Sequence, residues 1–458
     1  MRIESLISFI MMQLQRRTSR HGRSTTARYP TELSLTSGAF ERYNIARNYV
    51  RFYNNVGITA TYEFPPNHFE TTNLRAVIFS ALRQVIDRHP VLSISIADEG
   101  TETPSFFRLC EIDLTEIVTF ADSDDSIEIA HRQPFEHLDV LPLWRVVVIQ
   151  KDALLDIGFF WHHVIGDGES GIAFHMSLSD ALQTPGDSSP IVIPRSQKLL
   201  PPAEEAMSLS LSFWYKLKIL YKVLFPQKPD SVLWSGPDVR AENNMTHLRT
   251  LFLPAMRVDS LVTHCRKHGV TITALFLVVI ARVLARMYPD YPHFTSKTAI
   301  SMRRFTDVGK DEMVGYVTSL RHYFSTREEK GHIYIDGKFS WEAVSQAREL
   351  ILSATKSPSN QGIALLKYLK NPIEWFRKQV GTKRPDSFEI SNLGVVDGKF
   401  KRLLFSQSSN VIGPAYVFSM VTLQGGELAI GLTWQEDIVT ANSAEKLLSD
   451  LTTELETI

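Results

Sequence analysis

The sequence is poor in cysteine, with only Cys110 and Cys265 among its 458 residues. Two cysteines cannot form the disulfide framework of a small secreted domain, and they are too few for a cysteine-based metal cluster. The scarcity of cysteine therefore predicts a protein of a reducing, intracellular compartment.

The chain also lacks an excess of either charge, because 49 Lys and Arg residues balance 50 Asp and Glu, for a formal net charge of −1. A nucleic-acid-binding domain would carry a basic surface, so we expect no nucleic acid partner. Hydrophobic residues make up 44% of the chain, which is typical of a globular protein and excludes a disordered or collagen-like one. The length is sufficient for roughly two or three domains.

No hydrophobic run in the body of the chain is long enough to cross a membrane. The most apolar run, residues 271–281, ends at Arg282, well short of the roughly 20 residues that a bilayer requires. Residues 403–426 carry no charge, but polar residues, glycine and proline interrupt them, which is typical of strands and turns.

The N-terminal segment differs from the rest in charge. Residues 1–28 contain six arginines and a single acidic residue, Glu4, with apolar residues at helical spacing. We interpret residues 1–36 as a basic extension, flexible or amphipathic. A mitochondrial presequence, an interfacial membrane helix, an unstructured tail and an upstream start codon all fit this composition.

Helical and strand-like patterns alternate through the rest of the chain, which predicts an α/β fold. A proline-rich stretch at residues 183–202 separates two regions of this kind. We predict an N-terminal subdomain over residues 37–190, a crossing linker with an amphipathic segment over 191–240, and a C-terminal subdomain over 241–458. A cleft at their seam would be a natural place for a ligand site.

The amphipathic segment, residues 207–225, is rich in apolar and aromatic residues and contains Lys216, Lys218 and Lys222. Three cations argue against a membrane-spanning helix. Two alternatives remain: a helix in peripheral contact with a membrane, or, the favoured prediction, a helix packed over the seam between the subdomains.

The residues that point most directly to chemistry are the consecutive His162 and His163, which end a strand-like run and precede a turn with Gly166, Asp167 and Gly168. Neighbouring side chains on a strand point to opposite faces, so the two histidines cannot easily share a metal ion, and we predict no metal site. One imidazole is expected to face the core and the other a cavity, where it suits proton removal from a hydroxyl or amine. The glycines would permit a tight turn.

Two questions about this motif stay open from the residues alone. Asp167 either orients a catalytic histidine or pins the turn by pairing with an arginine. The histidines also have a structural alternative, because buried, hydrogen-bonded histidines at strand ends are common.

The motif resembles the HHxxxDG signature of the CoA-dependent acyltransferase superfamily, which includes chloramphenicol acetyltransferase, the plant BAHD acyltransferases and peptide-synthetase condensation domains. The order of further segments is similar to that of fungal alcohol O-acetyltransferases. These segments are Glu-Arg-Tyr-Asn-Ile-Ala-Arg at 41–47, Ser-Met-Arg-Arg-Phe at 301–305, Gly-Tyr-Val at 315–317 and Ser-Asn-Leu-Gly at 391–394.

The resemblance implies two chloramphenicol acetyltransferase-like subdomains with mixed sheets and a tunnel at their interface. It also implies that His163 is the general base, His162 its structural neighbour, and Asp167 the partner of an arginine that shapes the loop. Condensation-type domains supply that arginine at the position of Ser93 here. The candidates for it are instead Arg145, Arg303 and Arg304.

Other roles are assigned by position within the resemblance. Asn392, Ser391 and Gln407 are candidates for the oxyanion site or the tunnel wall, and Arg303 and Arg304 are also candidates for binding CoA phosphates. The family uses acetyl-CoA as a co-substrate, and the resemblance implies no permanently bound cofactor.

The predicted function is transfer of an acetyl group from acetyl-CoA to an alcohol, in fungal ester or secondary metabolism. We expect a monomer, in the cytoplasm or peripheral on an ER or lipid surface, with a mitochondrial location if the N-terminus is a presequence. One alternative is an acyltransferase or condensing enzyme that uses a carrier-protein thioester or an amine acceptor. Another is a non-catalytic binding protein that retains the fold.

Overall fold

The computed structural model describes residues 35–65, 73–123, 125–184, 186–225 and 230–458. All of them belong to the unit that spans Ser34–Ile458. The predictions for the basic N-terminal extension lie outside the described residues, apart from Leu35 and Thr36, which form a short strand, β1, paired with β4 (Ser105–Arg108).

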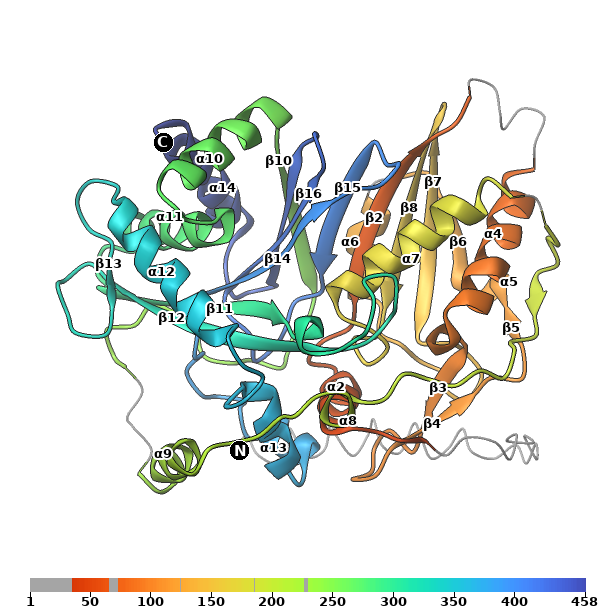
Figure 1. The fold of residues 1–458 in the computed structure, drawn as a ribbon, viewed down its shortest axis with the longest axis horizontal. Helices are drawn as coiled ribbons and strands as arrows, with labels where there is room; N and C mark the ends of the chain where they lie inside the picture. The colour runs from red at the N-terminus through yellow and green to blue at the C-terminus, as the bar shows by residue number, and fades with distance from the viewer. Residues whose placement is uncertain (1–34, 66–72, 124, 185, 226–229) are drawn as a thin grey trace. The chain divides into compact units, whose positions relative to one another are not determined.

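The first lobe is built on a five-stranded mixed sheet in the order β15-β2-β8-β7-β6, in which only β6 and β7 run parallel (Figure 1). Helices α4 and α7 pack against each other and over this sheet. The elements of this lobe up to the linker are α2 (Ala39–Tyr49), β2 (Val56–Glu63), α4 (Leu74–Arg88), β3 (Ile94–Ala97), β5 (Ile112–Asp113), α5 (Leu114–Ile117), β6 (Val118–Ala121), α6 (Asp125–Arg132), β7 (Trp144–Lys151), β8 (Leu154–Trp161), α7 (Gly168–Ala181) and β9 (Ile191–Val192).

The second lobe contains a seven-stranded mixed sheet in the order β10-β17-β16-β14-β11-β12-β13. Its core helix is α11, which begins after Thr271, whose side chain accepts a hydrogen bond from the amide of Ala274. The elements are β10 (Thr246–Leu253), α10 (Ala255–Lys267), α11 (Ile272–Met287), β11 (His293–Ser301), β12 (Val317–Ser325), β13 (Ile333–Tyr334), α12 (Trp341–Ala354), α13 (Pro372–Arg377), β14 (Phe388–Val396), β16 (Tyr416–Leu423), β17 (Leu428–Gln435) and α14 (Ala441–Glu456).

One strand crosses between the lobes. Although β15 (Arg402–Gln407) follows β14 in the chain, it pairs antiparallel with β2 and forms the edge of the first sheet. The predicted subdomain bounds follow the chain and do not account for this exchange. The two lobes therefore share a sheet as well as a connecting segment.

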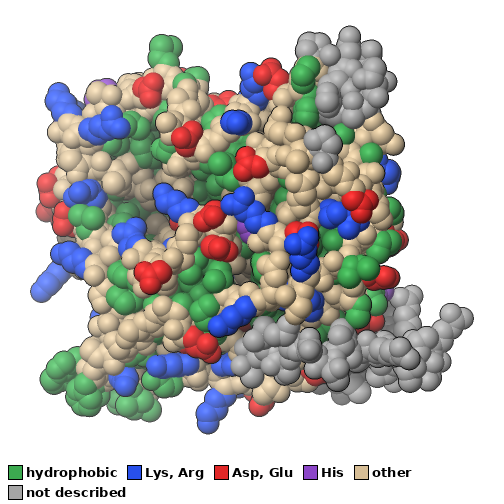
Figure 2. All heavy atoms as spheres, turned by 45° about the vertical axis from the view of Figure 1, so that its right-hand side comes forward, with side chains coloured by type: hydrophobic (Ala, Val, Ile, Leu, Met, Phe, Trp, Pro, Cys, Tyr) green, Lys and Arg blue, Asp and Glu red, His purple; other side chains and the backbone are tan. Residues whose placement is uncertain are grey.

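The connecting segment contains two helices of opposite character. In α8 (Ala203–Ala206), Ala203 is fully buried, together with Met207, in a cluster with Phe40 of the first lobe and Tyr316 of the second. By contrast, α9 (Phe213–Leu224) has no buried residue and lies at the periphery of the ribbon (Figure 1). At the corresponding height of the space-filling view, hydrophobic side chains gather at the lower left edge (Figure 2). The prediction that this helix packs over the seam is wrong, because too little of its surface meets the rest of the protein.

Within the described part of the chain, no single helix has the length and hydropathy of a membrane span. The pair α10 and α11 meets these criteria together, with a bend of 101° between the two helices.

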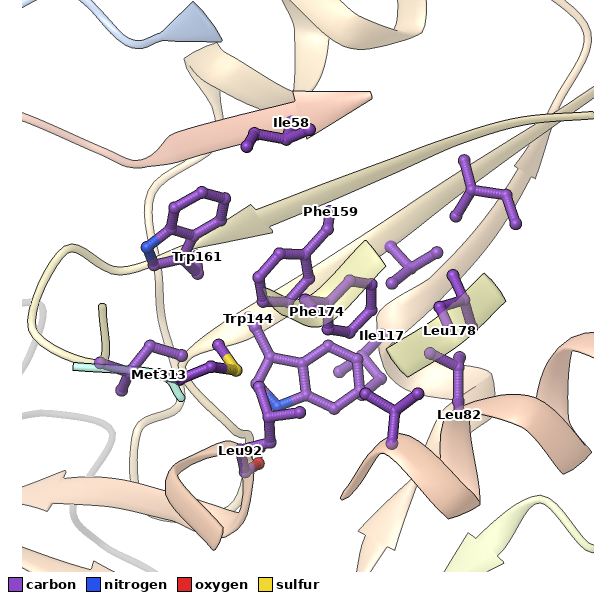
Figure 3. Packing of buried hydrophobic residues seen from close by; sticks show 14 of the residues in the cluster. Ile58, Leu82, Leu92, Ile117, Trp144, Phe159, Trp161, Phe174, Leu178 and Met313 are labelled. Carbon is purple, nitrogen blue, oxygen red and sulfur yellow. Dashed lines mark hydrogen bonds between the residues drawn. The ribbon is translucent and has the colours of Figure 1, made fainter. Parts of the chain in front are cut away.

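The core of the first lobe contains an aromatic stack formed by β8, whose end precedes the two histidines, and α7. The rings of Phe159 and Phe174 lie 3.7 Å apart and nearly parallel, and Trp161 stacks on Phe159 at 4.9 Å. Figure 3 shows these rings beside Trp144, surrounded by aliphatic side chains of β2, α4 and α7. Because Phe159 and Trp161 are fully buried, they fix the strand that ends at the histidines.

Candidate active site

The two histidines lie just beyond the end of β8, a strand paired on both sides. Trp161, its last residue, pairs with Val56 of β2 and with Trp144 of β7. The amide of His162 then donates to the carbonyl of Leu143 at 2.8 Å. The backbone that carries His163 is therefore held from two sides.

The two imidazoles have different surroundings. His162 is buried beside Phe135, with 5.9 Å between ring centroids, and its Nδ1 accepts a hydrogen bond from the amide of Val164. His163 is only partly buried, and its Nδ1 has no hydrogen-bond partner among the described residues. His163 therefore has one buried ring nitrogen, Nδ1, that no described residue engages.

His163 lies where the two lobes meet. The ring of Phe40, from α2, stands edge-on to it, with 5.6 Å between ring centroids. Phe40 also packs against Gly315 of the second lobe so closely that a Cβ there would lie 2.5 Å from the ring.

Both histidines are held in the neutral form by their environment. Burial, and then the charge of Arg47, lower the pKa of His163 to about 4, although Asp167 and the backbone at His163 and Gly166 act in the opposite direction. Burial likewise lowers the pKa of His162 to about 3. A neutral imidazole at pH 7 can accept a proton, as a general base must.

Arg47 and Tyr53 form a layer beside His163. The guanidinium of Arg47 lies 3.9 Å from the centre of the Tyr53 ring, whose centroid is 6.1 Å from that of His163. Arg47 is buried and donates to Asn44 Oδ1 at 2.6 Å. A cation is therefore buried next to the imidazole.

No role was predicted from the sequence for Phe40, Arg47 or Tyr53. The only signal was that residues 41–47 resemble the opening segment of the family.

Gln407, a candidate for the oxyanion site or tunnel wall, lies next to this layer. Its Oε1 accepts a hydrogen bond from the Tyr53 hydroxyl at 3.0 Å, and its Nε2 donates to Ser419 Oγ at 3.1 Å. Because both ends of the amide are engaged, Gln407 positions Tyr53 in this structure.

Asp167 pairs with Arg303, one of the three candidates. Arg303 Nη2 lies 2.8 Å from Asp167 Oδ1, and the two side chains are 5% and 6% exposed. Asp167 also caps α7 by accepting from the amide of Ser170, and it accepts from the amide of Tyr316 in the second lobe. Burial acts against the charge of Arg303, but Asp167 outweighs it and the pKa of the guanidinium is raised. The carboxylate thus ties the histidine loop to the opposite lobe.

The other two arginine candidates are not partners of Asp167. Arg145 lies over the Phe135 ring and donates to Gln133 and to the carbonyl of Pro134, whereas Arg304 is exposed. The prediction that Arg145 pairs with Asp167 is therefore wrong. The predicted CoA contact of Arg303 and Arg304 stays a prediction.

The remaining oxyanion candidates lie on β14, close to the start of α7. Asn392 Nδ2 donates to Thr273 Oγ1 and its Oδ1 accepts from the amide of Gly394, where the strand has a bulge. Through these two hydrogen bonds, Asn392 connects the bulge of β14 to α11. Ser391 is partly buried on the same strand and pairs in register with Ser419 of β16.

Gly166 and Gly168 are required because they lack a side chain, and not because they adopt a left-handed backbone conformation. Neither Gly166 nor Gly168 has a positive φ. A Cβ at Gly166 would lie 2.5 Å from the Ser170 side chain, and one at Gly168 would lie 2.5 Å from Leu393 of the second lobe. The predicted turn is present, since the amide of Ile165 donates to the carbonyl of His162, and close packing explains why both positions are glycine.

Comparisons with known proteins agree with this arrangement. Residues 128–455 match the model of the alcohol acetyltransferase family. A "probable alcohol acetyltransferase" of Aspergillus fumigatus is 24% identical, covering 88% of this chain and 96% of that protein. Another of Fusarium pseudograminearum is 26% identical, covering 90% of this chain and 93% of that protein.

Solved structures share the fold at low sequence identity. A trichothecene 15-O-acetyltransferase from Fusarium sporotrichioides matches with a TM-score of 0.68 and 12% identity, covering 92% of this chain and 94% of that one. The condensation domain of a monacolin K polyketide synthase matches with a TM-score of 0.61 and 12% identity, covering 93% and 96%. These likenesses confirm the predicted α/β fold of two acyltransferase-like lobes, whereas the tunnel stays a prediction.

The family match extends across 328 of the 458 residues, both lobes included. The predicted resemblance is thereby confirmed: the chain belongs to the alcohol acetyltransferase family, and it is an acetyltransferase enzyme.

Proposed function

We propose that the enzyme transfers the acetyl group of acetyl-CoA to the hydroxyl of a small-molecule alcohol, with His163 as general base. The observation that carries this proposal is the position of His163, a neutral and partly exposed imidazole held at the seam of two lobes. Both substrates meet directly at this imidazole, so the reaction needs no covalent acyl-enzyme.

The proposed reaction balances with His163 as the only proton carrier. As the alcohol oxygen bonds to the thioester carbon, its proton passes to the imidazole. The tetrahedral intermediate then collapses, the carbon–sulfur bond breaks, and the imidazolium returns the proton to the CoA thiolate. The products are the acetate ester and free CoA.

The charge of Arg47 has two opposite effects on this chemistry. A buried cation near the imidazole disfavours the imidazolium that forms when the alcohol is deprotonated, but it favours the negative charge that develops on the thioester oxygen. Because Arg47 lies over the Tyr53 ring and acts on the pKa of His163 through its charge, we assign it an electrostatic role.

In this proposal, the Asp167 carboxylate takes no part in proton transfer. Arg303, Ser170 and Tyr316 occupy both of its oxygens. Its role is to keep the loop that follows His163 in place against the second lobe.

The acceptor is proposed to be a hydroxylated metabolite. The Fusarium sporotrichioides structure is described as a trichothecene 15-O-acetyltransferase, so an enzyme of this fold acylates a metabolite hydroxyl. Condensation domains share the fold as well, which keeps a carrier-protein thioester as an alternative donor to be tested.

The test is to measure free CoA thiol released from acetyl-CoA by purified enzyme, against a panel of alcohols and amines. For His163→Ala we expect a loss of about 10²–10⁴-fold in rate with the fold retained. His264→Ala, at a partly exposed position on α10, is the matched control and should keep full activity.

The outcomes separate the possible donors and roles. Alcohol-dependent release that His163→Ala retains would contradict the general-base assignment. No release, without acetyl-CoA binding by calorimetry, would overturn acetyl-CoA as the donor and direct attention to a carrier-protein thioester or a non-catalytic role.

A further inference from the structure

Helix α9 exposes a large apolar surface and makes few contacts with the rest of the protein. None of its residues is buried. Seven large hydrophobic residues from 213 to 224, together with Phe225 after them, are 44–75% exposed: Phe213, Trp214, Leu217, Leu220, Tyr221, Val223, Leu224 and Phe225. An exposed patch of this kind marks an interaction surface.

Four of the exposed apolar residues lie in one row along the helix. Phe213, Leu217, Leu220 and Leu224 follow one another at intervals of three and four residues, so they form a continuous row. Tyr215 and Ile219, on the opposite side, are only partly exposed. The apolar row therefore points away from the protein.

The charges of α9 are all positive, and two of the three lysines lie beside this row. Lys216 and Lys218 adjoin Leu217 in the sequence, and one falls on each side of the apolar face at helical spacing. Lys222 is exposed on the last turn, and the helix contains no acidic residue. Lysines flanking a face with Trp and Tyr are the pattern of a helix that lies in a membrane interface.

The helix is attached to the second lobe at its N-terminal end. Ser210 Oγ lies 2.7 Å from Ser359 Oγ, and the amides of Ser212 and Asn360 donate to Asn360 Oδ1 and to the carbonyl of Ser210. The apolar row is consequently presented from a fixed point on the protein surface.

The charge of α9 favours an anionic lipid surface over two other partners for the apolar row. A second copy of α9 packed against the first would bring two sets of lysines together without acidic partners. Residues 1–28, with six arginines and one acid, carry the same sign as α9. An anionic lipid surface complements the lysines and accepts the apolar row.

We propose that α9 binds the protein peripherally to membranes that contain anionic lipids, with its apolar row inserted among the acyl chains and its lysines at the phosphate level. This inference is independent of the proposed acetyl transfer, because no residue of α9 belongs to the candidate active site.

The test is flotation of the full chain with phosphatidylcholine vesicles, with and without phosphatidylserine. The wild type should bind the anionic vesicles. The triple variant Trp214→Ser, Leu217→Ser, Leu224→Ser should reduce that binding roughly tenfold or more. The variant Lys216→Gln, Lys218→Gln, Lys222→Gln should reduce binding to the level found with phosphatidylcholine alone.

Matched controls use residues that are equally exposed elsewhere. The variant Val140→Ser, Ile193→Ser, Met256→Ser removes apolar side chains that are 59–84% exposed, and it should bind as the wild type does. The variant Lys330→Gln, Lys338→Gln, Lys399→Gln removes three exposed lysines outside α9 and should retain binding.

Three results would overturn the proposal. The wild type could fail to bind either kind of vesicle, or the serine variant could bind as well as the wild type, which would place binding in another segment. Thirdly, sedimentation could show a dimer that the serine variant dissociates while vesicle binding is unchanged, which would assign the face to a second copy. Circular dichroism of each variant confirms that the fold is retained.

Discussion

Asp167 and Arg303 form a buried ion pair between the lobes, with Oδ1 and Nη2 2.8 Å apart. The aspartate follows the two histidines by a few residues, and the arginine follows β11 in the second lobe. The guanidinium also donates to the carbonyls of Gly309 and Glu312. One side chain thus organises a loop of its own lobe while it holds the loop of the histidines.

Asp167→Asn should destabilise the protein by about 1.5–3 kcal/mol, because it removes charged hydrogen bonds to Arg303, whose Nε keeps only Glu169, at 3.2 Å, as a carboxylate partner among the described residues. Chemical denaturation measures this loss, and activity should fall with the loss of loop order. Glu374→Gln, which removes an exposed ion pair with Lys378, is the control and should leave the free energy of unfolding unchanged. Unchanged stability with lost activity would instead indicate a direct role of Asp167 in proton transfer.

The acid side of the pH–rate profile should lie unusually low. Since burial and Arg47 lower the pKa of His163 to about 4, the imidazole stays neutral and able to accept a proton down to about pH 5. We expect kcat/KM to be constant from about pH 7 to about pH 5 and to fall below that. The measurement is initial rate against pH, with circular dichroism at each pH. An acid limb near pH 6.5, the ordinary histidine value, would contradict this account.

Arg47→Gln should raise the pKa of His163, because it removes a positive charge that opposes protonation. The acid limb of the pH–rate profile should then move to higher pH and the maximal rate should fall. Arg47→Lys keeps the charge and should restore the position of the limb, even if it packs less well over Tyr53. If both variants lose activity while the limb stays in place, the role of Arg47 is structural.

Acid should unfold the protein through its buried neutral histidines. Burial lowers the pKa of His131 to about 3 and that of His175 to about 4, whereas both titrate near 6.5 when unfolded. The unfolded chain therefore binds these protons first, so the stability present above pH 6.5 is lost as the pH falls toward 4. Each histidine contributes a slope of about 1.4 kcal/mol per pH unit in this window.

The variant that tests this slope is His131→Gln, because the His131 ring donates and accepts only within the protein, at Asn55 and Ser406. It should reduce the slope of unfolding free energy against pH between pH 6.5 and 4 by one histidine's share. His137→Asn, at an exposed turn, is the control and should leave the slope unchanged. A slope that His131→Gln does not alter would contradict the assignment.

The sequence was sufficient to predict elements whose pattern reflects burial on one side or throughout. The strand that ends at Trp161, directly before the histidines, and the helix that begins after Thr271 are of this kind. Helix α2 could not be located in this way, because Asn44, Arg47 and Asn48 are buried along with its apolar residues. Its two active-site contributions, Phe40 and Arg47, therefore had no pattern that distinguished them.

The arginine that pairs with Asp167 could not be identified from the sequence, for a different reason. Three arginines had the right chemistry to pair with Asp167, and only the fold brings Arg303 to it across 136 positions of the chain. For helix α9 the favoured prediction was wrong for another reason. Its apolar residues predicted packing against the protein, but they are exposed, and apolar composition alone does not specify what a surface binds.

The exchange of β15 has a consequence for how the protein is made. The last residue of that strand, Gln407, contacts Tyr53 from a position 354 residues later in the chain. While a ribosome is still translating the second half, the first sheet has been synthesised without its edge strand, and β2 exposes unpaired backbone groups. The first sheet therefore cannot be completed until nearly the whole polypeptide has been synthesised, and until then β2 must be kept from pairing with other chains. Chains that terminate early should aggregate, whatever the intrinsic stability of their completed parts.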